Sequence, residues 1–135
     1  MRVEFLTTLD VRKLEGRDWL LLAPFVVAVD GEAIKVPAGY VTDFASVPRW
    51  PLAFMLTGGL GEKSATVHDW LYEIKAGRDY ADNVLRALLI AEGEPEWRAR
   101  AMYAGVRVGG EARYGERVPA PPPLPADPRE SELPL

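Results

Sequence analysis

The chain contains no cysteine and only one histidine, His68. The absence of cysteine excludes disulfide bonds and thiolate metal sites. A zinc ion would then be left with one histidine and a set of carboxylates, which is a weak zinc site. A hard cation such as calcium, bound by aspartate oxygens and backbone carbonyls, fits the available ligands better.

The chain also lacks a net positive charge and a long apolar run. The formal net charge is -4 and the pI is about 5.1, which argues against nucleic acid as the main partner because phosphate binding needs a basic face. No signal peptide is visible, since Arg2 and Glu4 lie in an alternating stretch. The longest apolar run, Trp19 to Val29, contains Pro24 and is too short to span a bilayer.

What remains is the composition of an ordinary globular domain, with 48% apolar and 27% charged residues in 135. The N-terminal third predicts β structure, because Val3, Phe5 and Leu9 alternate with polar residues. The run from Trp19 to Val29 is interpreted as a buried strand, and Asp30-Gly31 directly after it predicts a two-residue hairpin turn. Residues 33–36 would return as a short strand, which completes a meander of about three strands.

Three long helices are predicted after this sheet. They cover residues 63–75, 79–91, and a stretch from Pro95 to Gly109-Gly110, with Gly77 and Gly93 as C-terminal caps of the first two. A shorter helix is expected to start at Ser46, Pro48 and Pro51 and to run on into Leu52 to Leu56. The residues expected to face the core are Val67, Trp70, Leu71, Ile74, Ala81, Val84, Leu85, Leu88, Leu89, Trp97, Ala101, Ala104 and Val108.

The sequence therefore predicts a single α+β domain over residues 1–112, with a small N-terminal antiparallel β-meander packed on three α-helices. Residues 113–135 are predicted to form a Pro-rich extended or disordered arm. Seven of the 12 prolines lie between Pro119 and Pro134, and the segment has no core-forming pattern. Such an arm could dock on the surface of a partner.

The candidate site lies on the first two helices. At about 100° per residue, His68, Asp69 and Tyr72 fall within one arc of the first helix. If the second helix packs antiparallel to it, Asp82 can face the same arc. The four side chains would then supply a general base, an orienting carboxylate, a phenol and one metal-ligand oxygen.

Each residue also has a structural interpretation. His68 could simply flank an apolar helix face, its ring nitrogen satisfied by a neighbour. Asp82 lies three residues after a possible N-cap at Asp79, where a capping-box acid would stand, and four residues after Arg78. Asp69 could be solvated, or could pair with a lysine of the same helix, Lys63 or Lys75.

Asp43 is a further candidate oxygen ligand that could reach the histidine from a loop, although an Asx-turn or helix cap would also explain it. Tyr103 and Arg107 of the third helix are interpreted as packing and surface residues. The glycines at positions 58, 59 and 61 do not form a phosphate loop, because no strand precedes them and no Gly-Lys-Ser/Thr follows.

Three motifs between residues 36 and 109 carry a resemblance to a known family. They are Pro37 to Pro48 (PAGYVTDFASVP), His68 to Tyr72 (HDWLY), and Arg78 with Ala81-Asp82. In order and spacing they resemble an uncharacterised bacteriophage and prophage family, domain-of-unknown-function family 1353. The resemblance implies a phage-derived or virion-related protein and carries no mechanism.

The two helices alone also resemble the catalytic core of phospholipases of the A-two class, through His-Asp-x-x-Tyr on one helix and Ala-Asp early in the next. This resemblance implies that His68 is the base, Asp69 a calcium ligand, Asp82 the residue that orients the histidine, and Tyr72 a supporting hydrogen-bond donor. The sequence departs from that class because no Gly-rich calcium loop of the expected form stands upstream, and the disulfides of secreted members are absent.

We therefore expect a phage protein of the virion, in the tail or its tip, that is made in the bacterial host cytoplasm. Its partners would be other virion proteins and host membrane lipid or envelope. The His/Asp site would be either a hydrolase centre used at the host envelope or a structural remnant of one. The competing hypotheses are a buried polar network formed by His68, Asp69, Asp82 and Asp43 that fixes helix packing, and a cytoplasmic assembly factor absent from the particle.

Overall fold

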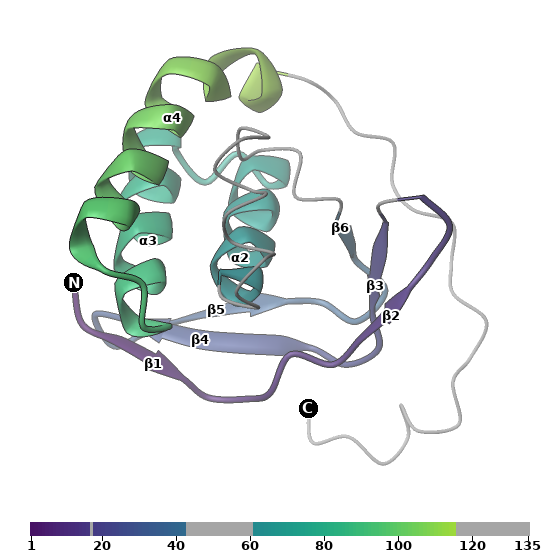
Figure 1. Cartoon of the computed structure of the whole chain (residues 1–135). Coiled ribbons are helices and arrows are strands. Elements are labelled where there is room, and N and C mark those ends of the chain that lie inside the picture. Colours follow the sequence, from purple (N-terminus) through teal and green to yellow (C-terminus); the bar gives the residue numbers. More distant parts are fainter. Residues whose placement is uncertain (17, 43–60, 116–135) are drawn as a thin grey trace.

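A computed structural model describes residues 1–16, 18–42 and 61–115 and gives an α+β protein, as predicted (Figure 1). Its strands are β1 (Val3–Phe5), β2 (Val11–Lys13), β3 (Trp19–Leu21), β4 (Phe25–Val29), β5 (Glu32–Val36) and β6 (Val41–Thr42). Its helices are α2 (Glu62–Glu73), α3 (Arg78–Ala91) and α4 (Glu96–Gly115).

The β structure consists of two three-stranded antiparallel sheets, with strand orders β1-β4-β5 and β2-β3-β6. The first of these sheets joins the three predicted strand regions in the predicted order, whereas the second sheet was not predicted. The apolar run from Trp19 to Val29 is divided between β3 and β4, which belong to different sheets. Pro24 lies in the turn between them, where its fixed φ and missing N–H would have interrupted a continuous strand.

The hairpin between β4 and β5 has the predicted two-residue turn. Val29 is paired with Glu32, and the residues between them, Asp30 and Gly31, have φ values of 50° and 81°. Positive φ at both central positions is the geometry that twists with the flanking strands and favours Asp-Gly. Along β4, Phe25, Val27 and Val29 are buried, so the sheet presents one apolar face to the helices.

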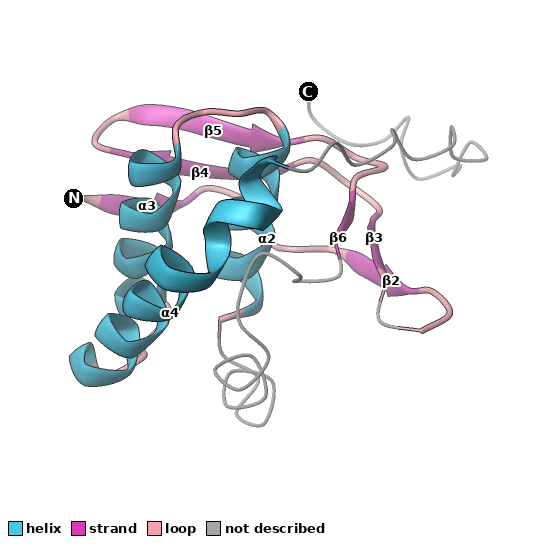
Figure 2. Ribbon diagram, turned by 90° about the horizontal axis from the view of Figure 1, so that it is seen from above, coloured by secondary structure: helices cyan, strands magenta, loops and turns pink. Residues whose placement is uncertain are grey.

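Helices α2 and α3 lie over that face, and α4 packs against α3 on the side away from the sheet (Figures 1 and 2). The main core lies between the sheet and the first two helices, and a second cluster joins α2, α3 and α4. The second cluster contains Ala65, Leu85, Leu89, Ala99, Met102 and Val106. The five core positions predicted for α3 are all buried.

The buried face of α4 differs from the predicted one. Ala99, Met102 and Val106 are buried, whereas Trp97 is 65% and Val108 is 87% exposed. Both sets have helical spacing, so periodicity alone could not decide which set faces the core. On α2, Val67 and Leu71 are buried as predicted, Trp70 is half-buried and Ile74 is exposed.

The helix ends differ slightly from the prediction. Helix α2 leaves the helical conformation at Lys75, which has φ 55°, and Gly77 precedes α3 as its N-cap instead of closing α2. Gly93, with φ 103°, follows α3 as predicted. Helix α4 passes through Gly109-Gly110 and ends at Gly115.

The helix expected from Pro51 and the arm from Pro119 lie outside the described residues, and the domain limit at residue 112 stays a prediction. Within the described ranges, none of the helices is both long enough and apolar enough to cross a membrane.

Candidate functional site

The antiparallel pairing of α2 and α3 brings the candidate residues together, as the sequence predicted. The chain reverses over Ile74 to Gly77, where the N–H of Ala76 donates to the carbonyl of Leu71 at 3.0 Å. His68 and Asp82 stand on either side of this reversal and meet in the space between the two helices.

The opposite end of the helix pair is joined by Glu92, which follows the last residue of α3. Its carboxylate accepts hydrogen bonds from the backbone N–H groups of Lys63 and Ser64, at 3.2 and 3.1 Å, and from the Ser64 hydroxyl. These amides belong to the first turn of α2, whose own N-cap is Gly61 and has no capping side chain. Burial raises the pKa of the Glu92 carboxyl, and the hydrogen bonds oppose that rise. Glu92 therefore caps α2 from the neighbouring helix and fixes the register of the pair.

Asp82 is the centre of the candidate site. His68 Nε2 lies 2.7 Å from Asp82 Oδ1, and the Tyr72 hydroxyl donates to the same oxygen at 2.6 Å. Both His68 and Asp82 are fully buried, and Tyr72 is 3% exposed. The rings of His68 and Tyr72 are in contact, with centroids 4.2 Å apart.

The other oxygen of Asp82 is held by α4. Arg107 Nη1 donates to Asp82 Oδ2 at 2.9 Å and lies 2.7 Å from Asp79 Oδ1. Arg78 also joins α3 to α4, but through the main chain of α4. Its Nη2 donates to the main-chain carbonyls of Val106, at 3.0 Å, and Arg107. Three helices thus meet at one carboxylate.

Electrostatics keep this carboxylate charged. Burial alone would raise the pKa of Asp82, but hydrogen bonds from His68, Tyr72 and Arg107 outweigh it and lower the pKa below the usual value. An ionised carboxylate only accepts hydrogen bonds, so the proton in the His68 contact is on Nε2. In the neutral ring the acceptor nitrogen is then Nδ1. Burial and the neighbouring Asp82 raise the pKa of the Tyr72 hydroxyl, which remains a donor.

The capping interpretation of Asp82 is wrong. Gly77, not Asp79, is the N-cap of α3. Asp79 stands in the first turn and pairs with Arg107. The cation that contacts Asp82 is Arg107 from another helix, and not the preceding Arg78.

Asp69 contacts the second sheet. It is 4% exposed, and its Oδ2 accepts a hydrogen bond from the hydroxyl of Thr42 at the end of β6. The expectation of a solvated Asp69 is therefore wrong. The ammonium groups of Lys63 and Lys75 lie over the rings of Phe5 and Tyr114, at 4.9 and 4.6 Å from the ring centroids.

The second predicted metal ligand, Asp43, lies outside the described residues. Among residues 1–16, 18–42 and 61–115, no three His, Cys, Asp or Glu side chains are grouped so that they could hold a metal ion. The predicted calcium site therefore rests on Asp69 and stays a prediction.

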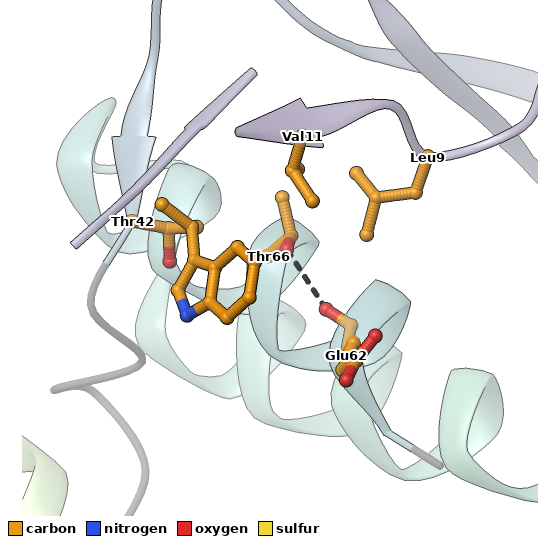
Figure 3. A pocket seen from close by; sticks show the side chains of 6 residues that line it. Leu9, Val11, Thr42, Glu62 and Thr66 are labelled. Atoms are coloured by element: carbon orange, nitrogen blue, oxygen red, sulfur yellow. Dashed lines mark hydrogen bonds between the residues drawn. The ribbon is translucent and has the colours of Figure 1, made fainter. Parts of the chain in front are cut away.

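A small hollow lies between the second sheet and the start of α2 (Figure 3), and one of its lining residues is Thr42, the hydrogen-bond partner of Asp69. Leu9 and Val11 stand opposite Glu62 and Thr66 of α2, and the Thr66 hydroxyl donates to the Glu62 carbonyl at 2.8 Å. The volume of about 20 Å³ has room for a single water molecule. His68, Asp82 and Tyr72 do not line it.

Sequence reasoning missed three contributors to this site: Arg107, Tyr114 and Thr42. Arg107 was interpreted as a surface residue, and it lies 25 residues from the Asp82 that it contacts. Tyr114 packs edge-on against Tyr72, with centroids 5.0 Å apart, and its hydroxyl accepts the N–H of Gly77. The signal available for Arg107 was that a basic residue on the neighbouring helix could pair with a buried acid. The sequence did not show which arginine would form that pair.

The fold and site define a class: an α+β protein in which three helices converge on a buried His-Asp-Tyr-Arg network. The model of a family described as "Protein of unknown function (DUF1353)" matches residues 19–106, so the chain belongs to that family. The match confirms the family predicted from the sequence motifs. It spans β3 to the residue before Arg107 and includes His68, Tyr72 and Asp82. No curated protein and no solved structure matches the chain significantly.

Proposed function

We propose that this chain is a bacteriophage virion-associated protein, part of the tail or its tip, in which the His68–Asp82 cluster is a buried polar network that fixes helix packing. The observation that best supports the structural role is the burial and hydrogen bonding of Asp82. Its carboxylate is fully buried and has three side-chain donors from two other helices.

Such a network favours one packing arrangement over others. Burying a carboxylate is costly unless every lone pair meets a donor. A shift of α3 by one turn, about 5.4 Å, would separate Asp82 from His68, Tyr72 and Arg107 together. The network therefore penalises wrong helix registers, which is a useful property in a subunit that must dock on neighbours with one fixed surface.

The phage assignment is supported by the resemblance of the three sequence motifs to phage and prophage sequences; the description of the matched family names no function. The partners would be other virion proteins. Mass spectrometry of purified phage particles tests this proposal against the assembly-factor alternative. We expect the protein at a constant copy number per particle after density-gradient purification. Its presence in infected cells together with its absence from purified particles would overturn the virion assignment and favour an assembly factor.

A second candidate function is hydrolysis of host-envelope material. It is favoured by the orientation of His68, since a general base needs a partner that fixes its ring, and Asp82 contacts Nε2 at 2.7 Å while Tyr72 and Arg107 fix Asp82. His68 would then be the base that activates water, as the resemblance to the phospholipases implies. Asp69, next in the chain, would hold calcium with oxygen donors from elsewhere.

Phospholipid vesicles and purified peptidoglycan, each with millimolar calcium, are the substrates that test this second function. Wild type should release fatty acid or soluble peptidoglycan fragments, and His68→Ala should not. Absence of turnover by folded wild type on both substrates would leave the structural role as the function of the network.

A further inference from the structure

Helix α4 contains two consecutive glycines, Gly109 and Gly110, in the last third of its 20 residues. Glycine is among the least favourable residues in a helix interior, because it loses the most backbone freedom there. Val108 is 87% exposed and Gly109 is exposed as well, so neither is held by the core. In Figure 1 the yellow-green end of α4 turns away from the line of the preceding turns. Helices commonly bend at such glycines, and α4 has a weak point here.

The part of α4 before the glycines is firmly attached to the rest of the protein. Met102 and Val106 are buried in the second core cluster. Arg107 Nη1 contacts the carboxylates of Asp82 and Asp79, at 2.9 and 2.7 Å. Both apolar packing and charge therefore hold this part in place.

The part after the glycines is attached through Tyr114. Its ring packs edge-on against Tyr72, with centroids 5.0 Å apart, and its hydroxyl accepts the N–H of Gly77 at 3.1 Å. The ammonium group of Lys75 lies 4.6 Å from the centroid of the same ring. All three contacts are made with α2 or with the turn between α2 and α3, so Tyr114 covers this turn and the ring of Tyr72.

Arg78 stabilises the end of the attached part. Its Nη2 donates to the main-chain carbonyls of Val106, at 3.0 Å, and Arg107. In a regular helix these two carbonyls accept the N–H groups of residues 110 and 111. If the helix ended before the glycines, the carbonyls would lose those donors but keep the Arg78 guanidinium, as a cation caps a helix C-terminus. The structure therefore already contains a cap for a shorter α4.

We propose that residues 109–115 form a strap that opens at the two glycines and closes on the turn between α2 and α3 through Tyr114. The closed state is the one in the structure. In the open state Tyr114 leaves Tyr72, and the Gly77 N–H loses its acceptor. The low helix propensity of the glycines and the cap from Arg78 both lower the free energy of opening, whereas the contacts of Tyr114 raise it.

The strap controls the cover of the buried network. Tyr72 is 3% exposed in the closed state, and its hydroxyl donates to Asp82, so removal of Tyr114 gives solvent a path to this side of the network. Arg107 precedes the glycines and keeps its contact with Asp82 in both states. Opening therefore uncovers the network without separating the three helices. This inference holds whether the network is structural or catalytic.

Hydrogen exchange of the Gly77 amide tests the proposal, because its N–H donates to the Tyr114 hydroxyl. We measure it by NMR on the full chain, under conditions where the exchange rate follows the open population. The Gly77 amide should exchange faster than that of Leu85, which lies in the buried part of α3 and needs global unfolding. Gly109→Ala should slow the Gly77 exchange about fivefold, since alanine favours the helix. Tyr114→Phe removes the acceptor and should accelerate it.

Ala104→Gly is the matched control, because it makes the opposite change at an exposed position of the attached part and should leave the Gly77 exchange unaltered. A second control is the Gly93 N–H, which donates to the Ile90 carbonyl at 3.1 Å beyond the other end of α3 and should not respond to Gly109→Ala. A Gly77 amide that exchanges as slowly as Leu85, or that is insensitive to Gly109→Ala, overturns the proposal.

Reaction of His68 with diethyl pyrocarbonate, which acylates accessible imidazole, tests whether opening reaches the network. His68 is the one histidine of the chain and is fully buried in the closed state. The reaction should be faster in Tyr114→Ala and slower in Gly109→Ala than in wild type. Trp97→Ala removes an exposed aromatic ring from the other end of α4 and should leave the rate unchanged. An equal rate in all four proteins would overturn the claim that the strap covers the network.

Discussion

His68 Nε2 lies 2.7 Å from Asp82 Oδ1, and neither side chain is exposed to solvent. This contact joins α2 to α3, and the second oxygen of the same carboxylate joins α3 to Arg107 of α4. The buried carboxylate is therefore the point at which the three helices are connected.

The pKa of Asp82 predicts a pH dependence of stability. Its folded-state pKa is lowered, so its contribution to stability is present above the unfolded pKa, about 3.9, and is lost as the pH falls through the folded value. Asp82→Asn should therefore unfold more easily than wild type at pH 7, and the difference should shrink below about pH 4. Urea unfolding across a pH series measures it. A difference that stays constant from neutral to acid pH would contradict this linkage.

Glu92 should contribute as the helix cap of α2. Glu92→Ala leaves the N–H groups of Lys63 and Ser64 without their acceptor, and we expect a loss of about 1–2 kcal/mol in the free energy of unfolding. Glu92→Gln keeps one acceptor oxygen and should lose less. Glu15→Ala, which removes an exposed carboxylate, is the control and should be nearly neutral. Equal stability of Glu92→Ala and Glu15→Ala would show that Glu92 is not a cap in solution.

Calcium should bind weakly at Asp69. A ligand specific to the folded state raises the melting temperature as its concentration increases, so thermal unfolding with increasing calcium reports the site. Asp69→Asn should abolish the shift. The absence of a shift at millimolar calcium, or an equal shift in Asp69→Asn, would exclude Asp69 as a calcium ligand.

The Pro-rich arm from Pro119 to Leu135 should act in assembly. Its leucines at positions 124, 133 and 135 are spaced apolar anchors, and a Pro-rich backbone loses little entropy on docking. Deleting the arm should leave the melting temperature nearly unchanged and reduce incorporation into particles. A markedly lower melting temperature of the truncated protein would place the arm within the folded domain.

Local signals in the sequence predicted much of this structure. Asp30-Gly31 specifies its own turn, and the apolar spacing of α3 selects its buried face. The outcome for α4 was different because this helix has two apolar faces, and only its packing on α3 decides that Met102 is inside and Trp97 outside. The His68–Asp82 contact followed from antiparallel packing of adjacent helices. The contact of Arg107 with Asp82 depends on the tertiary position of α4, which no local pattern specifies.

The energetic coupling between His68 and Asp82 tests the central claim most directly. A double-mutant cycle of His68→Ala and Asp82→Asn, measured by urea unfolding at pH 7, isolates the energy of their contact. We predict that each single variant loses about 1–3 kcal/mol and that the double variant loses clearly less than the sum. Variants as stable as wild type, with no coupling, would contradict a structural network and leave catalysis as the reason for this arrangement.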